Sequence, residues 1–358
     1  MKRLVFIINY IENNGPTMVL KNLAFSLDKK DFDVIVLTLF DKNSKDVIKE
    51  FEKHDIEVLS LNIKSSIIQL LKNRSKIIQK IKNISPDIIH THGYVPTILL
   101  GNNFSNINKI TTIHNNMLED YIYTYGKLKG RILVRLHIHF LKKFDHVICC
   151  SETSYNYLKN SVKNATYIRN GIDINCSDNK CRQEIRKNLE IPLDAIVYIY
   201  VGMLSSRKKV LELLELFDNY KNDDEYLIVL GDGDLKDKCQ KYDSSQIKIL
   251  GFKDNPIDYM QASDVYTSNS GSEGFSISII EALECGLYLL LSEIPSHIEC
   301  FNIDSNYYIG EFFSSDTYDD KKKLLRLKMS NDRKKLIKKF KKVYLSSEKM
   351  KNEYKKYY

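Results

Sequence analysis

The hydrophobic pattern of the chain alternates between short apolar runs and longer amphipathic segments. Residues 4–8 form an apolar run rich in β-branched side chains, which is typical of a strand buried on both faces. A turn signal at residues 13–17 follows, and residues 18–27 then carry apolar side chains at helical spacing. Strand–helix alternation of this kind predicts a parallel sheet with helices on both faces.

The same alternation runs through most of the chain and falls into two series. In the first series we expect further strands at 34–37, 58–61, 88–90, 110–113 and 146–149, and helices at 47–52 and 66–81. The second series starts after Gly171, with strands at 195–201, 226–230, 247–250, 264–267 and 287–291, and helices at 210–220, 258–262 and 276–285. We therefore predict an α/β protein of two tandem doubly wound, Rossmann-like domains facing a cleft. Ligands of such sheets bind beyond the carboxyl ends of the strands.

The domain boundaries follow from the same pattern. We expect an N-terminal domain over residues 1–172, a C-terminal domain over 173–340, and a basic C-terminal helix over 341–358 that packs back on the N-terminal domain. The connection between the domains is expected near residues 173–190, where Cys, Ser, Asp and Asn cluster. Within the tail, Leu336, Phe340, Val343 and Tyr344 fall on one predicted helical stripe.

Composition and charge narrow the function classes. Hydrophobic residues make up 43% and charged residues 28% of 358 residues, which is a globular composition. The formal charge of +8 divides into +13 on residues 321–358 and −5 on the rest, which argues against a nucleic-acid-binding face. The basic tail leaves an anionic membrane surface open as a partner.

Segment lengths and cysteines indicate the compartment. No apolar run reaches the ~20 residues that a membrane span needs, and none suits a signal peptide, so we expect a protein that stays where it is made. The seven cysteines show no C-x-x-C spacing, which favours reduced thiols over disulfides or a zinc site.

The most informative segment for chemistry is residues 272–283, which follows a predicted strand and opens a helix. Gly274 permits a close approach of the backbone to a ligand, and the amides from Phe275 through Ser276 to Ile277 would be unpaired at the helix start. Such amides, with the helix dipole, suit a diphosphate. Glu273 and Glu281 flank them and could accept hydrogen bonds from sugar and ribose hydroxyls. The alternative is that both glutamates are solvated helix charges, but the Gly-Phe turn and the apolar spacing argue against it.

This segment resembles the E-x7-E region of family 4 glycosyltransferases, which have the GT-B fold. The likeness continues through Cys285-Gly286 to Pro295. Other pieces occur in the family's order: Asn170-Gly171-Ile172-Asp173, Val201-Gly202-Met203-Leu204-Ser205 with Lys208, Gly231-Asp232-Gly233, Leu250-Gly251-Phe252, Ala262-Ser263-Asp264-Val265, Asn14-Gly15-Pro16, Pro86 to His92, and Thr112-Ile113-His114-Asn115. Each motif is short, but the collinear set covers nearly the whole chain.

The resemblance implies roles for individual residues. Glu273 would contact the donor sugar, Glu281 the nucleotide ribose, and Lys208 the donor diphosphate. The family's Arg position holds Met203, which carries no charge, and Arg207 is our hypothesis for its replacement; a surface Arg in a turn is the alternative. The Gly15 turn would also help to bind the donor.

The histidines and an acidic pair are further candidates for catalysis and metal binding. By resemblance, His114 touches donor sugar or acceptor from the N-terminal domain. His90 and His92 are interpreted as structural or acceptor-side residues, and His137 and His139, two apart in a helical stretch, as non-catalytic. The D-x-D appearance of Asp232 to Asp234 falls where the family has a G-x-G strand end, so we expect no metal and no cofactor.

The resemblance predicts a retaining glycosyltransferase of bacterial surface-polysaccharide synthesis. It would move a hexose or N-acetylhexosamine from a nucleotide diphosphate sugar, with a UDP-sugar favoured over GDP-mannose, to a glycan or polyprenyl-linked acceptor. We expect a cytoplasmic enzyme, with peripheral attachment at the inner face of the cell membrane through residues 333–358 left open, and no nucleic acid as partner. The alternative is a non-catalytic nucleotide-sugar-binding or scaffold subunit with the same fold.

Overall fold

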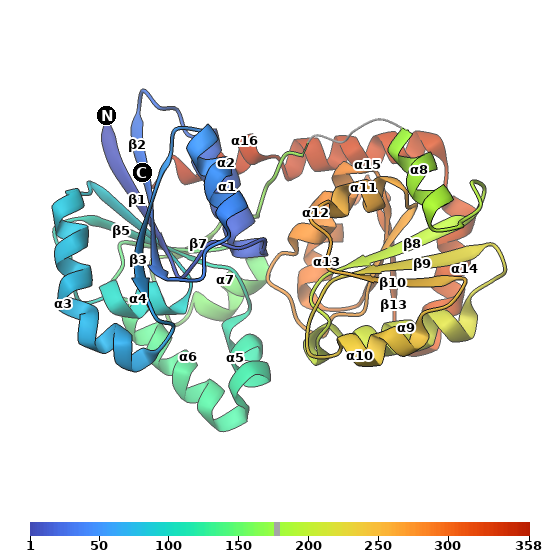
Figure 1. Ribbon diagram of the computed structural model, residues 1–358, viewed down its shortest axis with the longest axis horizontal. Helices are drawn as coiled ribbons and strands as arrows, with labels where there is room; N and C mark the ends of the chain where they lie inside the picture. Colours follow the sequence, from blue (N-terminus) through green and yellow to red (C-terminus); the bar gives the residue numbers. More distant parts are fainter. Residues whose placement is uncertain (175–179) are drawn as a thin grey trace. The chain divides into compact units, whose positions relative to one another are not determined.

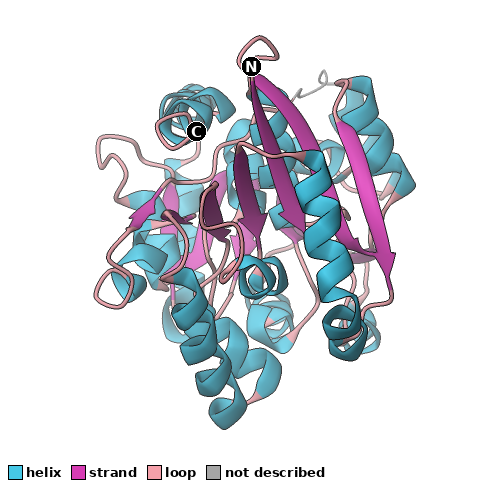
Figure 2. Ribbon diagram, turned by 90° about the vertical axis from the view of Figure 1, so that its left-hand side faces the viewer, coloured by secondary structure: helices cyan, strands magenta, loops and turns pink. Residues whose placement is uncertain are grey.

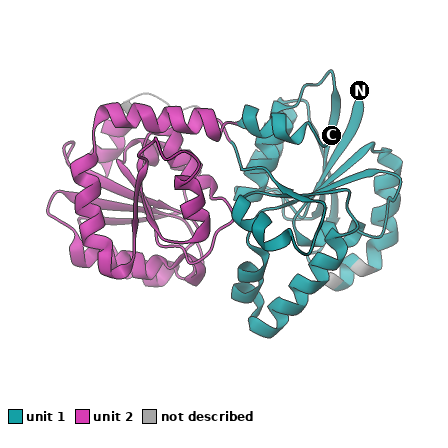
Figure 3. Cartoon of the chain, turned by 180° about the vertical axis from the view of Figure 1, so that it is seen from behind, with its two compact units in different colours: residues 1–171, 347–358 teal, residues 172–346 magenta. Residues whose placement is uncertain are grey.

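The computed structural model describes residues 1–174 and 180–358, which form two compact units (Figures 1 and 3). Unit 1 comprises Met1–Gly171 and Ser347–Tyr358, and unit 2 comprises Ile172–Ser346. Each unit is one parallel sheet with helices packed on it, so the expected α/β class with two doubly wound sheets is confirmed. Residues 175–179, inside the connection expected near 173–190, and with them Cys176, lie outside the described residues.

Unit 1 contains a seven-stranded sheet in the order β3-β2-β1-β4-β5-β6-β7. Its strands are β1 (Lys2–Ile8), β2 (Phe32–Phe40), β3 (Glu57–Ile63), β4 (Ile88–His92), β5 (Asn108–Ile113), β6 (His146–Cys149) and β7 (Ala165–Tyr167). Its helices are α1 (Gly15–Ser26), α2 (Lys45–Lys53), α3 (Ile67–Ile84), α4 (Tyr94–Leu100), α5 (Met117–Tyr125), α6 (Lys127–Leu141), α7 (Glu152–Leu158) and α16 (Ser347–Tyr354). Figure 2 shows helices on both sides of these strands.

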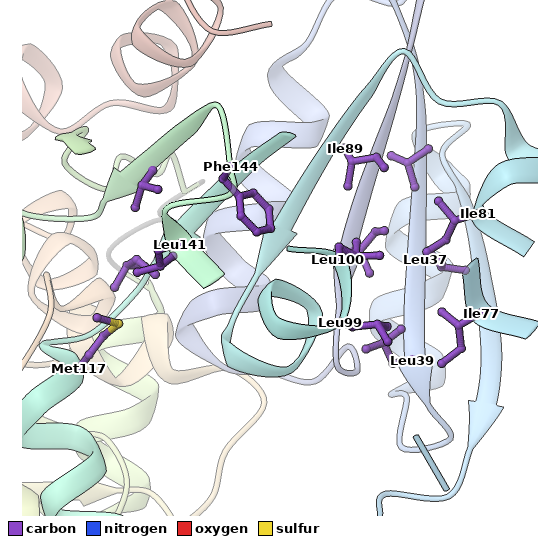
Figure 4. Packing of buried hydrophobic residues seen from close by; sticks show 14 of the residues in the cluster. Leu37, Leu39, Ile77, Ile81, Ile89, Leu99, Leu100, Met117, Leu141 and Phe144 are labelled. Atoms are coloured by element: carbon purple, nitrogen blue, oxygen red, sulfur yellow. The ribbon is translucent and has the colours of Figure 1, made fainter. Parts of the chain in front are cut away.

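The core of unit 1 explains why the strands read as uninterrupted apolar runs. Strand β1 is central, and its residues from Leu4 to Ile7 are fully buried because helices cover both faces of the sheet. Figure 4 shows one layer of this core, in which Leu37 and Leu39 of β2 pack against Ile77 and Ile81 of α3. The sheet order reverses between β1 and β4, and at such a switch point the loops after the two strands diverge and leave room for a ligand.

Unit 2 contains a six-stranded parallel sheet in the order β10-β9-β8-β11-β12-β13. Its strands are β8 (Ile196–Val201), β9 (Glu225–Leu230), β10 (Ile247–Gly251), β11 (Val265–Ser268), β12 (Tyr288–Ser292) and β13 (Gly310–Phe313). Its helices are α8 (Lys180–Asn188), α9 (Val210–Tyr220), α10 (Lys236–Cys239), α11 (Pro256–Gln261), α12 (Ile277–Glu284), α13 (Pro295–Phe301), α14 (Tyr318–Lys328) and α15 (Asn331–Tyr344), with 3₁₀ turns η1 (Ser206–Lys208), η2 (Gln240–Tyr242) and η3 (Ser315–Thr317). Its switch point lies between β8 and β11.

The C-terminal segment departs from the expected division at residue 341. Helix α15 runs to Tyr344 inside unit 2, and the chain re-enters unit 1 only at Ser347. The buried face of α15 is made by Ile337, Phe340 and Lys341. Of the expected stripe Phe340 is buried, whereas Leu336 and Val343 are about half exposed. Lys341 is buried since its ammonium group pairs with carboxylates of Asp173 and Glu284.

The last residues of the chain are part of the core of unit 1. The Tyr358 hydroxyl lies 2.7 Å from Nδ1 of His90, and the Tyr354 hydroxyl lies 3.0 Å from Thr112 Oγ1. Lys2 Nζ donates to the Tyr358 carbonyl oxygen at 2.6 Å. Tyr354 and Tyr358 therefore form an aromatic anchor that holds the basic tail on unit 1, and His90 is a structural partner of that anchor.

Candidate active site

The geometry after β8 and β11 brings Lys208 and Glu273 together. Lys208 ends the 3₁₀ turn η1 behind β8, and Glu273 lies in the loop between β11 and α12. The Lys208 ammonium forms an ion pair with Oε1 of Glu273, and Arg207 Nη1 lies 3.6 Å from Oε2. These groups are 65 residues apart in sequence and meet because β8 and β11 are neighbours at the switch point of the sheet.

The surroundings of Glu273 keep it ionised. Burial alone would raise the pKa of Glu273, but the charges of Lys208 and Arg207 and the Lys208 hydrogen bond outweigh burial and lower it to about 2. The Ser270 hydroxyl donates to Glu273 Oε1 at 2.7 Å, and Ser292 Oγ donates to the Ser270 carbonyl oxygen at 2.8 Å. Glu273 is therefore a fixed carboxylate that accepts hydrogen bonds and cannot act as an acid at neutral pH.

Arg207 lies partly buried beside Glu273 and is not an exposed turn residue. Its side chain is 20% exposed, and Nη1 donates to the Ser272 carbonyl oxygen at 2.6 Å. Met203, at the family's Arg position, is 59% exposed, and its carbonyl oxygen accepts from the Tyr200 hydroxyl. The structure thus brings a second cation to Glu273 from a position four residues later in the chain than Met203.

Helix α12 begins at Ile277, with Ser276 as its N-cap, so its first amides have no acceptor within the helix. Phe275 is buried beside them, and Gly274 lies in the loop that joins them to Glu273. Glu281 lies one turn further along the helix and is only 7% exposed, which excludes a solvated side chain. The amides expected to form an anion site and the two glutamates expected to flank it thus lie around the start of one helix in unit 2.

His297 is a polar residue of this region that the sequence reasoning missed. It lies on α13, is 1% exposed, and its Nδ1 donates to the Ser292 carbonyl oxygen at 2.8 Å. Burial lowers its pKa to about 4, so the ring is neutral and Nε2 is an acceptor. That Nε2 and the Ser205 hydroxyl are buried without a hydrogen-bond partner among the described residues. The signal available in the sequence was a polar residue in the first turn after a buried strand.

The G-x-G strand end has a structural role. At Gly231, with φ +150°, a Cβ atom would lie 1.8 Å from the Gly202 carbonyl oxygen, and at Gly233 it would lie 2.5 Å from that of Leu204. Asp232, between them, is exposed and pairs with Lys236 at 3.2 Å. The two glycines let the loops after β8 and β9 touch through their backbones, which supports the position of η1.

Unit 1 has its own cavity of about 270 Å³ at the carboxyl ends of β1, β4 and β5. It is bounded by the start of α1, where Gly15 is the first helical residue and Asn14 caps the helix, and by α5 and α6. Among the residues that line it are Asn9, Asn14, His92, Tyr94, His114, Asp120, Tyr121, Tyr125 and His137. Aromatic rings beside hydroxyl, amide and carboxylate groups are the chemistry that binds a sugar.

The histidines of this cavity are neutral. Nδ1 of His92 and Nε2 of His114 are 2.9 Å apart, and Nδ1 of His137 is 2.9 Å from the Tyr121 hydroxyl. Burial lowers the pKa of His114 to about 4 and that of His137 to about 3. Nε2 of His92 and of His137 are buried and unpartnered among the described residues, as is Oδ1 of Asn9. His139 is exposed on the other side of α6, so only His137 joins the site.

Two doubly wound units, each with polar groups at its switch point, define an α/β protein of GT-B architecture. The Anabaena protein HepE in complex with UDP-glucose superposes with a TM-score of 0.81 at 15% identity, covering 99% of each chain. Residues 13–175 match the Glycosyltransferase Family 4 model, and residues 181–343 match the Glycosyl transferases group 1 model. The chain belongs to the family 4 glycosyltransferases, and it is a glycosyltransferase enzyme.

Two curated relatives come from Escherichia coli. The O-antigen biosynthesis glycosyltransferase WclY is 29% identical over 316 residues, which is 84% of this chain and 82% of that protein. The UDP-Gal:alpha-D-GlcNAc-diphosphoundecaprenol alpha-1,3-galactosyltransferase is 26% identical over 257 residues, which is 64% of this chain and 63% of that protein. Across the described residues, no helix has the length and apolar content to cross a membrane.

Proposed function

We propose that the protein transfers a hexose or N-acetylhexosamine, with retention of anomeric configuration, from a nucleotide diphosphate sugar in surface-polysaccharide synthesis. We favour a UDP-sugar as donor and a glycan or polyprenyl-linked sugar as acceptor. The observation that carries the proposal is the Glu273 carboxylate held by Lys208 and Arg207 beside the first amides of α12. The name of the galactosyltransferase supports the donor and acceptor classes, and the name of WclY supports surface-polysaccharide synthesis.

The donor fits this arrangement group by group. A diphosphate at the start of α12 receives hydrogen bonds from the helix amides and charge from Lys208 and Arg207. As Lys208 turns to the phosphates, Glu273 accepts hydroxyl hydrogen bonds from the sugar, and Glu281 accepts from the ribose. His297 Nε2, a buried acceptor without a partner, takes a further hydroxyl. The substrate would thus satisfy a buried nitrogen that has no hydrogen-bond partner among the described residues.

The reaction needs no protein nucleophile in this proposal. The bond between the anomeric carbon and the diphosphate oxygen breaks, and positive charge develops on the sugar ring. The ionised Glu273 lies beside that charge, while Lys208, Arg207 and the α12 amides stabilise the leaving diphosphate. The acceptor hydroxyl oxygen bonds to the anomeric carbon on the face that the diphosphate leaves, and its proton passes to a leaving phosphate oxygen. We infer no metal and no cofactor, because cations and amides supply the charge.

The cavity of unit 1 is the acceptor site in this proposal. Its volume of about 270 Å³ lies just below the ~300–1,000 Å³ of pockets for drug-sized ligands, so it suits one sugar ring. The neutral pairs His92–His114 and Tyr121–His137 offer both donors and acceptors to sugar hydroxyls. His114 is therefore proposed as a polar contact of the reacting sugar.

A donor panel tests the proposal directly. We expect a UDP-sugar to raise the melting temperature more than GDP- and ADP-sugars do, and the matching UDP-sugar to release UDP in the presence of acceptor. Glu273→Gln removes the carboxylate that faces the sugar, and we expect turnover to fall by ~10²–10³-fold. Glu293→Gln, at an exposed glutamate after β12, is the matched control and should keep full turnover. Donor binding without any UDP release would overturn the transferase proposal for these sugars.

A further inference from the structure

Helices α5 and α6 form a hairpin that projects from the rest of unit 1 (Figures 1 and 3). Its turn is Gly126, at φ +82°, a conformation that side chains other than glycine rarely adopt. The two helices touch closely at Gly130, where a Cβ atom would lie 2.7 Å from the Tyr121 carbonyl oxygen. The hairpin is therefore a packed element that can present a fixed surface.

The two faces of this hairpin differ in what they carry. The inner face contributes Tyr121 and His137 to the cavity of unit 1. The outer face of α6 exposes Leu128, Ile132 and Leu136, which are 76%, 57% and 42% exposed. Because these three residues are four apart, they form one apolar line along the helix. A line of large aliphatic side chains in water is costly unless another surface covers it.

Cationic side chains flank the apolar line. Lys127, Lys129, Arg131 and Arg135 are all exposed on α6, and Lys142 and Lys143 are exposed just beyond its end. No acidic residue occurs anywhere from residue 126 to residue 144. An exposed helix with an aliphatic line, basic flanks and no carboxylate has the chemistry of a helix that lies in the interface of an anionic bilayer.

We propose that the outer face of the α5–α6 hairpin docks on an anionic lipid bilayer. The leucine and isoleucine side chains enter the headgroup boundary, and the lysines and arginines extend along the surface toward lipid phosphates. If the acceptor is lipid-linked, which rests on the proposed function, docking places the cavity behind the same helices next to the membrane that holds the acceptor. The docking itself needs only the outer face.

The structure favours this hairpin over the basic tail as the membrane contact. Ile337, Phe340 and Lys341 of α15 are buried in unit 2, and Tyr354 and Tyr358 are buried in unit 1. Most large apolar side chains of the tail are therefore buried in the protein core. The exposed side chains of residues 333–358 are chiefly lysines, with Leu336 and Val343 as the exposed aliphatic residues.

Sedimentation with vesicles tests the proposal. The vesicles contain equal parts of phosphatidylcholine and phosphatidylglycerol, with phosphatidylcholine alone as the neutral reference. We expect the triple variant Leu128→Gln/Ile132→Gln/Leu136→Gln to bind the anionic vesicles at least ~10-fold more weakly than the unsubstituted protein. The double variant Leu193→Gln/Leu327→Gln changes two exposed leucines of unit 2 and is the matched control, expected within about twofold. Equal binding by the triple variant and the control would overturn the proposal.

A second pair of variants separates the two basic elements. Arg131→Gln/Arg135→Gln should weaken binding to the anionic vesicles and reduce its dependence on salt, whereas Lys338→Gln/Lys342→Gln on α15 should change neither. Loss of binding only in the α15 variant would assign the membrane contact to the tail and refute the hairpin.

Activity with a soluble acceptor keeps this test distinct from the proposed function. The triple variant should release UDP from donor and a lipid-free acceptor sugar at the rate of the unsubstituted protein, since none of its three residues lines the cavity. Its melting temperature should rise with the donor as before. Normal turnover with unchanged vesicle binding refutes the docking surface alone, whereas absent turnover in the unsubstituted protein refutes the proposed function alone.

Discussion

Replacement of Lys208 by methionine separates the two tasks that the geometry gives to this residue. The Lys208 ammonium pairs with the Glu273 carboxylate, and we propose that it faces the diphosphate when donor binds. Methionine keeps much of the length and apolar stem of lysine and removes only the charged group. The Lys208 side chain is 14% exposed and the Glu273 side chain is 9% exposed, so the positive charge is lost from a largely desolvated place.

The structure sets the size of the stability effect. Removing one partner of a buried ion pair typically costs ~3–5 kcal/mol. Here Arg207 remains 3.6 Å from Glu273 Oε2 and the Ser270 hydroxyl remains 2.7 Å from Oε1. We therefore expect Lys208→Met to lower the free energy of unfolding of unit 2 by ~2–3 kcal/mol, or ~5–10 °C in melting temperature.

The pH dependence has a definite sign. The folded state lowers the pKa of Glu273 from 4.5 to about 2, so the ion pair stabilises the fold above pH 4.5 and this contribution is lost as the pH falls toward 2. The difference in stability between the original protein and Lys208→Met should thus be constant from pH 5 upward and shrink in acid. Scanning calorimetry at a series of pH values measures it.

The double variant Lys208→Met/Glu273→Gln completes the cycle. Without a lone buried carboxylate, it should recover to within ~1 kcal/mol of the original stability, yet its donor affinity and turnover should stay low. Donor titration calorimetry and UDP release supply these readouts, and we expect Lys208→Met alone to reduce turnover by ~10²–10³-fold. A Lys208→Met protein that is less stable but turns over normally would show that Lys208 is only a structural partner of Glu273, and a double variant no more stable than the single one would refute the ion-pair argument.

Three further outcomes are expected. Gly231→Ala should destabilise unit 2 by ~3 kcal/mol or more, because the new Cβ atom would lie 1.8 Å from a carbonyl oxygen. Gly251→Ala, at φ +68° with open space around it, should cost only ~1–2 kcal/mol. Equal losses of stability in calorimetry would contradict the backbone contact at Gly231. Tyr358→Ala should lower the stability of unit 1 by ~3–5 kcal/mol, since it empties a core position and leaves Nδ1 of His90 without its hydroxyl partner. An unchanged unfolding curve would contradict the aromatic anchor. Tyr121→Phe should raise the KM for acceptor several-fold and leave the Kd for donor unchanged, and an altered donor Kd would remove the cavity from the acceptor role.

Most strands of both sheets were predictable because each of them is a local property of the chain. Strands buried on both faces read as apolar runs, and the expected run at residues 226–230 lies within β9. The edge strands β7 and β13 were not predicted, since they have only three and four residues and leave little apolar signal. The expected boundaries of helices differ from the observed ones by a few residues, because caps and solvent decide where a helix ends.

The sequence by itself determined the fold class, the order of the elements and the loops that carry Lys208, Glu273 and His114, because strand ends and helix starts follow from local patterning. It could not determine that Arg207 and Ser270 contact Glu273, that His297 and His137 present unpartnered nitrogens, or that the basic tail ends in buried tyrosines. Those features depend on which strands become neighbours and which helix faces are covered, over separations of 65 residues for Lys208 with Glu273 and 268 for His90 with Tyr358. Only the tertiary structure sets such distances. The burial that lowers the pKa of His137 and the exposure of the aliphatic line on α6 are properties of the assembled fold and of no segment alone.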